Sequence, residues 1–362
     1  MKKSVFVSIS FAVLLGVSFI YTLCFPVQLV TRPVYKVDSV IGTEDNMEIT
    51  QPDAYFVEDD KIAYFSIEKE AVTFVEDLSV LGKEYKKSYI TGNINGFVKY
   101  RKDGSLLQFF SPNGSLLNEQ RGGGCYPYIE DESSVVYAIK DNGRNLSAFY
   151  FNGEPMLREY ADNSLICSVS VSKNLDTSIS YADGYSQLLS KNGEIIFSCE
   201  QRKPEIKIAK ASCYSSDNKY FCEISGLYPE LLTIYDMETK EQIVQTPTGS
   251  NSRYMPLMKI YGDTVYYETE KSLEIYSIDK EKKYSLQFNG ELVDFKVNMQ
   301  NEVILLSEKD SMNYLYIYNH AGIRSFYQES YNDISNLRVY NSETFYFKLD
   351  KEIYILRRKM FS

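Results

Sequence analysis

"YSQLLSKNGEIIFSCE", residues Tyr185 to Glu200, alternates apolar and polar residues on both sides of an Asn-Gly dipeptide. This alternation predicts two β-strands, and Asn-Gly between them predicts a hairpin with a two-residue turn that has positive φ at both positions. Similar stretches recur along the chain, and the first arm of each ends in an apolar dipeptide. These dipeptides begin at Phe74, Phe109, Phe149, Leu188, Ile234, Ile275, Ile317 and Ile353.

The spacing of these dipeptides indicates the fold. The intervals between them run from 35 to 46 residues and average about 40, and a period near this value with four short strands per unit is typical of a β-propeller. Helical repeats of this length would need apolar residues at spacings of three and four, which these segments lack. We therefore expect an all-β chain that folds as a β-propeller of eight blades, or of seven if the unit around Phe74 is irregular.

The two ends of the chain are expected to close the ring together. The eighth copy stops after one strand of its second hairpin, at Ile353 to Met360, which would leave an unpaired strand edge. The segment from Val27 to Val40 has the composition of a strand and belongs to no other blade. We expect it to pair beside 353–360 as the outer strand of the last blade, with Pro33 at the edge, where a missing N–H group is tolerated.

One turn carries a resemblance to a known class of propeller. "YDMETKEQIVQ", Tyr235 to Gln245, is similar to the D-x-x-T-G-K turn of quinoprotein-type blades, with Asp236, Thr239 and Lys240 in place. The glycine of that pattern and its docking tryptophan are both missing. Beyond about residue 45, the chain resembles the WD40-like and quinoprotein-like propellers of bacterial envelopes. The resemblance implies an architecture and leaves the activity open.

The amino terminus indicates export. Two lysines precede Ser4 to Leu23, a run of twenty residues without a charge. A helix of this length spans a bilayer, and flanking lysines favour a cytoplasmic amino terminus. We expect a cytoplasmic tip and signal-anchor helix in residues 1–25, a juxtamembrane segment in 26–45 and the propeller in 46–362, on the periplasmic side of the cytoplasmic membrane. A cleaved signal peptide and a lipoprotein modified at Cys24 are the alternatives, and both also export the domain.

Composition and motifs argue against several functions. Asp and Glu number 49 against 39 Lys and Arg, and this acidic balance argues against nucleic-acid binding. The single histidine, His320, lies in a predicted hairpin turn, and no closely spaced Cys or His pairs suggest zinc. "RGGGCYPY", Arg121 to Tyr128, lacks the Lys-Ser/Thr of a phosphate-binding loop and is interpreted as a connection between two blades. We predict no catalytic residue, cofactor or metal site, and no enzyme activity.

Two cysteines are expected to lie side by side. In "ASCYSSDNKYFCE", a turn centred on Asp217 and Asn218 places Cys213 opposite Cys222 in a non-hydrogen-bonded pair. At that position they form a disulfide if the compartment is oxidising. The alternative is two buried thiols that act as small hydrophobic side chains.

The longer loops suggest a binding role. Strand parity places the connections at 121–128, 201–207, 225–230 and 245–256 on one face of the ring. They contain tyrosine and arginine, the residue types enriched at interface hot spots. We expect a non-catalytic, membrane-tethered scaffold that binds other envelope proteins. The alternative is a small-molecule-binding or carbohydrate-acting enzyme that uses the central channel. The candidate partner-binding residues are Arg121, Tyr126, Tyr228, Arg253 and Tyr254.

Overall fold

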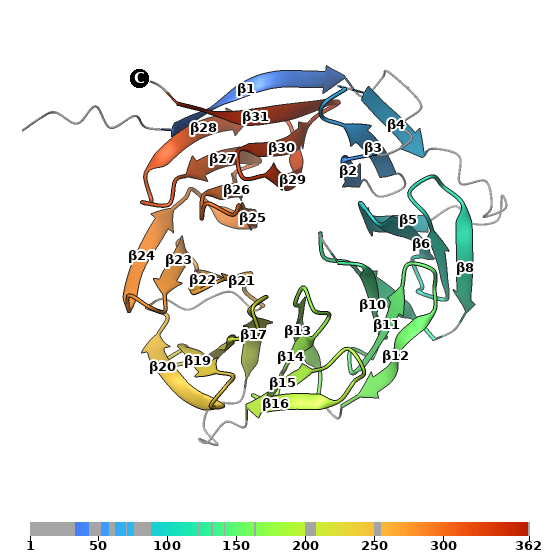
Figure 1. Ribbon diagram of the computed structural model, residues 1–362, viewed down its shortest axis with the longest axis vertical. Coiled ribbons are helices and arrows are strands. Elements are labelled where there is room, and N and C mark those ends of the chain that lie inside the picture. The colour runs from blue at the N-terminus through green and yellow to red at the C-terminus, as the bar shows by residue number, and fades with distance from the viewer. Residues whose placement is uncertain are drawn as a thin grey trace, which may run out of the picture.

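The computed structural model describes residues 33–42, 52–57, 62–69, 71–75, 88–121, 123–131, 133–140, 142–162, 164–199, 208–249 and 255–360. Their strands form eight separate sheets around a central axis (Figure 1). Seven sheets have four strands, and the first has three within the described residues. The predicted eight-bladed, all-β propeller is confirmed. No helix within these ranges is long and apolar enough to cross a membrane. The predicted anchor, Ser4 to Leu23, lies outside them and stays a prediction.

The blades follow one another in chain order. Blade 1 contains β2 (Ala54–Val57), β3 (Ile62–Ser66) and β4 (Ala71–Val75); blade 2 contains β5 (Ser88–Asn93), β6 (Gly96–Arg101), β7 (Leu106–Phe110) and β8 (Leu116–Arg121). Blade 3 contains β9 (Cys125–Tyr128), β10 (Val135–Lys140), β11 (Asn145–Tyr150) and β12 (Pro155–Ala161); blade 4 contains β13 (Ile166–Val171), β14 (Thr177–Tyr181), β15 (Ser186–Leu189) and β16 (Ile195–Cys199).

The second half of the ring repeats the arrangement. Blade 5 contains β17 (Ala209–Tyr214), β18 (Tyr220–Ser225), β19 (Leu231–Asp236) and β20 (Glu241–Pro247); blade 6 contains β21 (Met258–Tyr261), β22 (Thr264–Glu268), β23 (Ser272–Ser277) and β24 (Lys282–Gln287). Blade 7 contains β25 (Glu291–Val297), β26 (Val303–Lys309), β27 (Met312–Tyr318) and β28 (Arg324–Ser330); blade 8 contains β29 (Ile334–Asn341), β30 (Thr344–Leu349), β31 (Glu352–Met360) and β1 (Pro33–Gly42).

Strand order defines two faces of the ring. Blades 2 to 8 each run antiparallel from an inner strand, A, at the channel to an outer strand, D, at the rim, and the three described strands of blade 1 correspond to A, B and C (Figure 1). The B–C connections and the connections from strand D to the next blade therefore emerge on one side, here called the DA face. The A–B and C–D connections emerge on the opposite side, here called the AB face.

Packing between blades closes the circle. Eight clusters of buried apolar side chains each combine residues of two neighbouring blades. One of them joins Tyr346 and Ile353 of blade 8 to Phe56 and Phe65 of blade 1. Because a single blade is too thin to bury its own faces, each sheet depends on both neighbours for its core.

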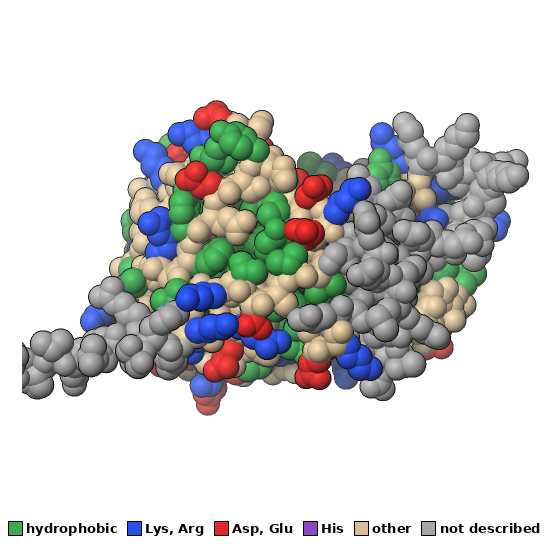
Figure 2. All heavy atoms as spheres, turned by 90° about the horizontal axis from the view of Figure 1, so that it is seen from above, with side chains coloured by type: hydrophobic (Ala, Val, Ile, Leu, Met, Phe, Trp, Pro, Cys, Tyr) green, Lys and Arg blue, Asp and Glu red, His purple; other side chains and the backbone are tan. Residues whose placement is uncertain are grey.

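The N-terminal strand β1 completes blade 8. It pairs antiparallel with β31, from Pro33 opposite Met360 to Gly42 opposite Glu352, and it is the outermost strand. This is the pairing expected for the Val27–Val40 segment, of which residues 27–32 lie outside the described ranges. The Asp38 carboxylate of β1 forms ion pairs of 3.2 Å and 3.0 Å with Arg357 and Lys359 of β31. Figure 2 shows this side of the rim, where basic and acidic side chains lie next to one another.

The turn of the hairpin between β15 and β16 differs from its prediction. Gly193 N donates to Ser190 O at 2.8 Å and Ser190 N donates to Glu194 O at 2.8 Å. Only Gly193, with φ of 82°, is left-handed, and the strand register shifts next to it, after Leu188. The loop therefore has three residues, a type I turn followed by a left-handed residue, and the predicted two-residue turn is wrong. A three-residue loop twists the strands as a blade requires and adds one bulge.

The turn that carries the family resemblance is formed as its residues suggest. Asp236 Oδ1 accepts hydrogen bonds from the Glu238 and Thr239 amides at 2.9 Å and 3.0 Å. Lys240 has φ of 58° and takes the left-handed conformation at the fifth position of the pattern, where the pattern has glycine. The placement of Lys240 at the pattern's lysine is therefore wrong by one residue, and Glu241 occupies that position.

Candidate functional site: the central channel

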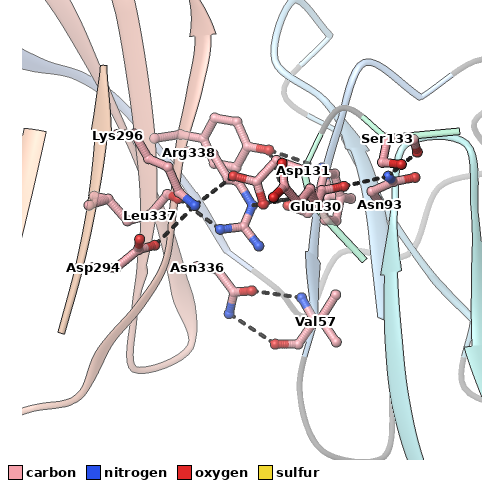
Figure 3. A network of polar contacts seen from close by, with 12 residues as sticks. Val57, Asn93, Glu130, Asp131, Ser133, Asp294, Lys296, Asn336, Leu337 and Arg338 are labelled. Carbon is pink, nitrogen blue, oxygen red and sulfur yellow. Dashed lines mark hydrogen bonds and ion pairs between the residues drawn. The ribbon is translucent and has the colours of Figure 1, made fainter. Parts of the chain in front are cut away.

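The connection between β9 and β10 makes polar contacts with the inner strands of several blades. It covers residues 129–134, of which Glu132 lies outside the described set. Blade 3 supplies this segment, and its contacts reach the inner strands of blades on both sides. Figure 3 shows Glu130 and Asp131 of this segment among side chains of several blades.

Asp131 is the centre of an ion-pair network. Its Oδ2 lies 2.6 Å from Lys296 Nζ on β25, and its Oδ1 lies 3.4 Å from Arg338 Nε on β29. Lys296 Nζ is also 3.2 Å from Asp294 Oδ2. Tyr55 of β2 donates its hydroxyl to Asp131 Oδ1 at 3.4 Å and accepts a hydrogen bond of 3.1 Å from Arg338 Nε. One carboxylate thus joins blade 3 to blades 7, 8 and 1 (Figure 3).

Backbone contacts hold the same segment on its other side. Asn93 Nδ2 of β5 donates to Glu130 O at 2.9 Å and to Ser133 O at 2.6 Å. The amide of Val171 on β13 donates to Glu130 Oε1 at 3.2 Å. Because blades 2 and 4 supply these donors, the segment is fixed at both of its neighbours as well as across the channel.

Burial and charge shift the titration of this cluster. Burial raises the pKa of Glu130, although Lys259 on β21 acts in the opposite sense. Burial alone would raise the pKa of Asp131, but Arg338, Lys296 and Lys259 hold it well below its usual range. Burial and then the like charge of Lys259 lower the pKa of Lys296. Asp131 is therefore ionised at neutral pH, whereas Glu130 is the carboxyl that gains a proton first.

The structure places the predicted partner-binding residues in separate sectors. Arg121 ends β8, and Tyr228 lies between β18 and β19. Tyr126 lies on strand β9, opposite Ile139, so its prediction as a loop residue is wrong. Lys140 of β10 pairs with Cys125, so the inner strand β9 begins at Cys125. Only residues 122–124 are left as the connection between blades 2 and 3. Arg253 and Tyr254 fall outside the described residues, as do 201–207.

Three of these residues point to the same face. Arg121 ends a D strand and Tyr126 lies near the start of an A strand, so both are toward the DA face, where the loop of Tyr228 also emerges. Tyr126 is 42% exposed and Tyr228 is 86% exposed. His320 is exposed in the turn between β27 and β28, on the AB face.

Cys213 and Cys222 are register partners on β17 and β18. Both are buried free thiols. Ser215 N donates to Tyr220 O at 2.9 Å, so by alternation Cys213 and Cys222 form a hydrogen-bonded pair, and the predicted non-hydrogen-bonded pair is wrong. The turn begins at Ser215, one residue earlier than expected, because Asn218 N donates to Ser215 O. Side chains in such pairs stand further apart than a disulfide requires.

Sequence reasoning missed the channel cluster. Its signal is an apolar–cation–apolar triplet on the inner strand of three consecutive blades: Met258-Lys259-Ile260, Phe295-Lys296-Val297 and Leu337-Arg338-Val339. Asp131, which contacts both Lys296 and Arg338, comes from a distant connection, so no local pattern pairs it with these cations. Within the described residues, no group of three or more His, Cys, Asp or Glu side chains is placed to hold a metal ion.

Comparisons with known proteins agree with the architecture. The solved structure of BamB from Moraxella catarrhalis matches with a TM-score of 0.61 and 15% sequence identity, over 91% of this chain and 99% of that one. At this identity the likeness concerns the fold alone. No curated protein matches the sequence. A family model described as that of a beta-propeller protein matches residues 1–358, and the chain therefore belongs to the beta-propeller protein family.

Proposed function

We propose that this protein is a non-catalytic, membrane-anchored propeller that binds other cell-envelope proteins through its DA face. The observation that carries the proposal is the distribution of exposed apolar side chains among the described connections. Among the described connections, five large exposed apolar side chains lie on the DA face and two, Met299 and Ile323, lie on the AB face. Exposed apolar groups gathered on one side of a rigid ring favour protein binding. The five are Leu165, Leu227, Tyr228, Met255 and Tyr331.

Strand direction supports this use of the DA face. Pro33 begins β1 opposite Met360, the last residue of β31, and a C strand ends on the AB face. The chain before Pro33 therefore enters the ring from the AB side. Residues 24–32 between the predicted anchor and β1 span at most about 30 Å when extended. An anchor attached in this way turns the AB face toward the membrane and leaves the DA face free for partners.

Site-specific photo-crosslinking in intact cells tests the binding face. A photoreactive phenylalanine analogue at Tyr228, which is 86% exposed, is compared with the same analogue at Ile323, which is 44% exposed on the AB face. We expect the Tyr228 position to give a discrete adduct with one envelope protein, and the Ile323 position to lack that adduct. Identical adducts at both positions, or adducts with cytosolic proteins only, contradict the proposal.

Membrane orientation is tested separately. Alkaline phosphatase fused after Ser362 is active only outside the cytoplasm, so we expect activity from the full-length fusion and none from a fusion that lacks residues 1–25. Membrane extraction distinguishes the anchor from a cleaved signal peptide: a retained helix needs detergent for release, and a cleaved signal leaves the protein in the soluble fraction. A lipoprotein also needs detergent, and acyl groups on Cys24 in a mass spectrum identify it. An inactive full-length fusion contradicts the periplasmic location.

Small-molecule binding in the central channel is the second candidate. It is favoured by the convergence of Lys259, Lys296 and Arg338 on the acidic segment, since enclosed cations are a common means of holding an anionic ligand.

A further inference from the structure

Asparagine followed by glycine is a chemically labile pair, because the glycine nitrogen can attack the side-chain amide carbon of the asparagine and expel ammonia. Glycine permits the attack since it has no Cβ to hinder the approach. The attacking nitrogen must give up its proton, so a glycine N–H that donates a hydrogen bond in a fixed turn is a poor nucleophile. The structure thus selects among the six such asparagines of this chain, Asn95, Asn113, Asn142, Asn152, Asn192 and Asn289.

Five of the six pairs lie in hairpin connections that engage the glycine N–H group. In four of them it donates to the carbonyl oxygen three residues earlier, at 2.8 or 2.9 Å; these glycines are Gly114, Gly143, Gly153 and Gly193. In the fifth, Gly96 is the register partner of Asn93 across a two-residue turn. The residues that flank such a turn are hydrogen-bonded to each other. The turn geometry therefore protects all five pairs.

The sixth pair lies in a different setting. Asn289 and Gly290 belong to the connection from β24 to β25, between blades 6 and 7, on the DA face. The Gly290 N–H group donates no hydrogen bond to any acceptor in the described part of the chain. Gly290 also lines an open hollow of about 390 Å³ together with Glu291 and Val293, and the Asn289 side chain is exposed. Solvent therefore reaches both residues of this pair.

The fold requires glycine after Asn289 and polarises the peptide between the two residues. Gly290 has φ of 78°, and a Cβ at this position would lie 2.1 Å from Glu308 O. The Asn289 amide donates to the Tyr316 hydroxyl at 3.2 Å, and the Ser307 hydroxyl donates to Asn289 O at 2.6 Å. The bond from Ser307 draws electron density from the Asn289–Gly290 peptide and so makes the Gly290 N–H group more acidic.

We infer that Asn289 is a site of spontaneous deamidation in the folded protein, with water as the co-reactant. Gly290 N forms a bond to Asn289 Cγ as its proton passes to solvent, the Cγ–Nδ2 bond breaks, and the nitrogen takes up a proton and leaves as ammonia. Water then opens the five-membered succinimide at either carbonyl carbon, which gives aspartate or isoaspartate. Either product adds a negative charge next to Glu291, and isoaspartate also adds one carbon to the backbone between β24 and β25. The site does not depend on any binding partner.

Peptide mapping by mass spectrometry tests the site in purified full-length protein incubated at pH 8. The other five pairs serve as internal controls, and a second sample is incubated unfolded in guanidinium chloride. We expect all six asparagines to deamidate at similar rates in the unfolded sample, since the local sequence then decides. In the folded sample Asn289 should react several-fold faster than each of the other five. Fragmentation that distinguishes isoaspartate from aspartate identifies the product.

Two variants give an independent readout. On isoelectric focusing, the folded wild type should accumulate an acidic form with time, and Asn289→Gln should not, because the longer glutamine side chain closes a ring far more slowly. The control Asn192→Gln, in the turn between β15 and β16, should accumulate it as the wild type does. Folded protein in which Asn289 reacts no faster than the other five, or in which N289Q still accumulates the acidic form, would overturn the inference. The wild-type peptide map decides even if N289Q folds poorly.

Discussion

The Tyr35 hydroxyl donates a hydrogen bond of 2.5 Å to Glu302 Oε2, although the two residues are 267 positions apart in the chain. Glu302 is fully buried and also accepts from Asn298 Nδ2 at 3.0 Å, while Arg358 Nε lies 3.6 Å from its other oxygen. The closing strand β1, strand β31 and the A–B turn of blade 7 thus meet at one carboxylate. This cluster fastens the N-terminal strand to the ring.

Replacement of Tyr35 by Phe should weaken the closure. The substitution keeps the ring in its apolar cluster but removes one donor from buried Glu302, which costs about 1–3 kcal/mol. Urea unfolding of the ectodomain measures the loss. Tyr331→Phe, at a position 79% exposed, is the matched control and should change stability by less than about 0.5 kcal/mol. Equal stabilities of Y35F and Y331F would remove this hydrogen bond from the account of closure.

Asp131→Asn should make the free energy of unfolding depend less on pH in the acidic range. The folded pKa of Asp131 is held below its usual range by Arg338, Lys296 and Lys259, against the effect of burial. Its contribution is therefore present above the unfolded pKa of about 3.9 and is lost as pH falls through the folded value. At pH 7 we expect D131N to lower the free energy of unfolding by about 1–3 kcal/mol; partial exposure of the Asp131–Lys296 ion pair limits the loss. The loss should be smaller at pH 3.

Chemical unfolding at both pH values checks this prediction. Asp333→Asn, at an exposed position on the DA face, serves as the control and should behave like the wild type at each pH. A D131N deficit that is the same at pH 3 and pH 7 would show that the network does not depend on the charge of Asp131.

The sequence predicted the ring well because the ring is built from local patterns. The apolar dipeptide at Ile234 and its seven counterparts lie on the third strand of each blade. The lengths of hairpin loops were harder to predict, since the same Asn-Gly sequence occurs in a two-residue turn and in a three-residue loop that ends at Gly193. The channel cluster was not predicted, because Asp131 and Lys296 meet only after the circle has closed. The position of Tyr126 depended on where pairing with β10 begins, which period-two alternation does not specify.

Glu223→Gln should remove a pH dependence of stability whose sign is opposite to that expected for Asp131. Glu223 on β18 is 2% exposed, and burial raises its pKa, with the Ser186 and Ser225 hydroxyls and the Cys199 thiol as its neighbours. Above the unfolded pKa of about 4.3, the unfolded chain releases a proton that the folded chain retains. Wild-type stability should therefore fall as pH rises toward the folded value.

The comparison of E223Q with the exposed control Glu194→Gln isolates this group. E223Q should be more stable than the wild type at pH 8 and no more stable at pH 4, as measured by thermal unfolding across that range. Parallel pH profiles for the wild type and E223Q would mean that Glu223 is ionised in the folded state.

The Cys213–Cys222 pair should remain reduced. The two residues occupy a hydrogen-bonded register position and are buried, which separates their sulfur atoms and shields them from oxidants. Exported ectodomain that is unfolded without reductant and treated with a thiol reagent should show all five cysteines after residue 32 as reactive. A count of three, with peptides 213 and 222 linked in a mass spectrum, would establish the disulfide instead.

The most direct test of the central claim, a ring closed by the N-terminal strand, is a crosslink between β1 and β31. Lys36 and Arg357 are register partners, so Lys36→Cys with Arg357→Cys should be joined within one chain by a short bifunctional thiol reagent. The control pair, Lys36→Cys with Glu352→Cys, is offset by about 17 Å along β31 and should remain unlinked. Peptide mapping that finds the 36–357 link alone is the predicted result. No link within the chain, or equal linking of both pairs, would contradict closure by β1.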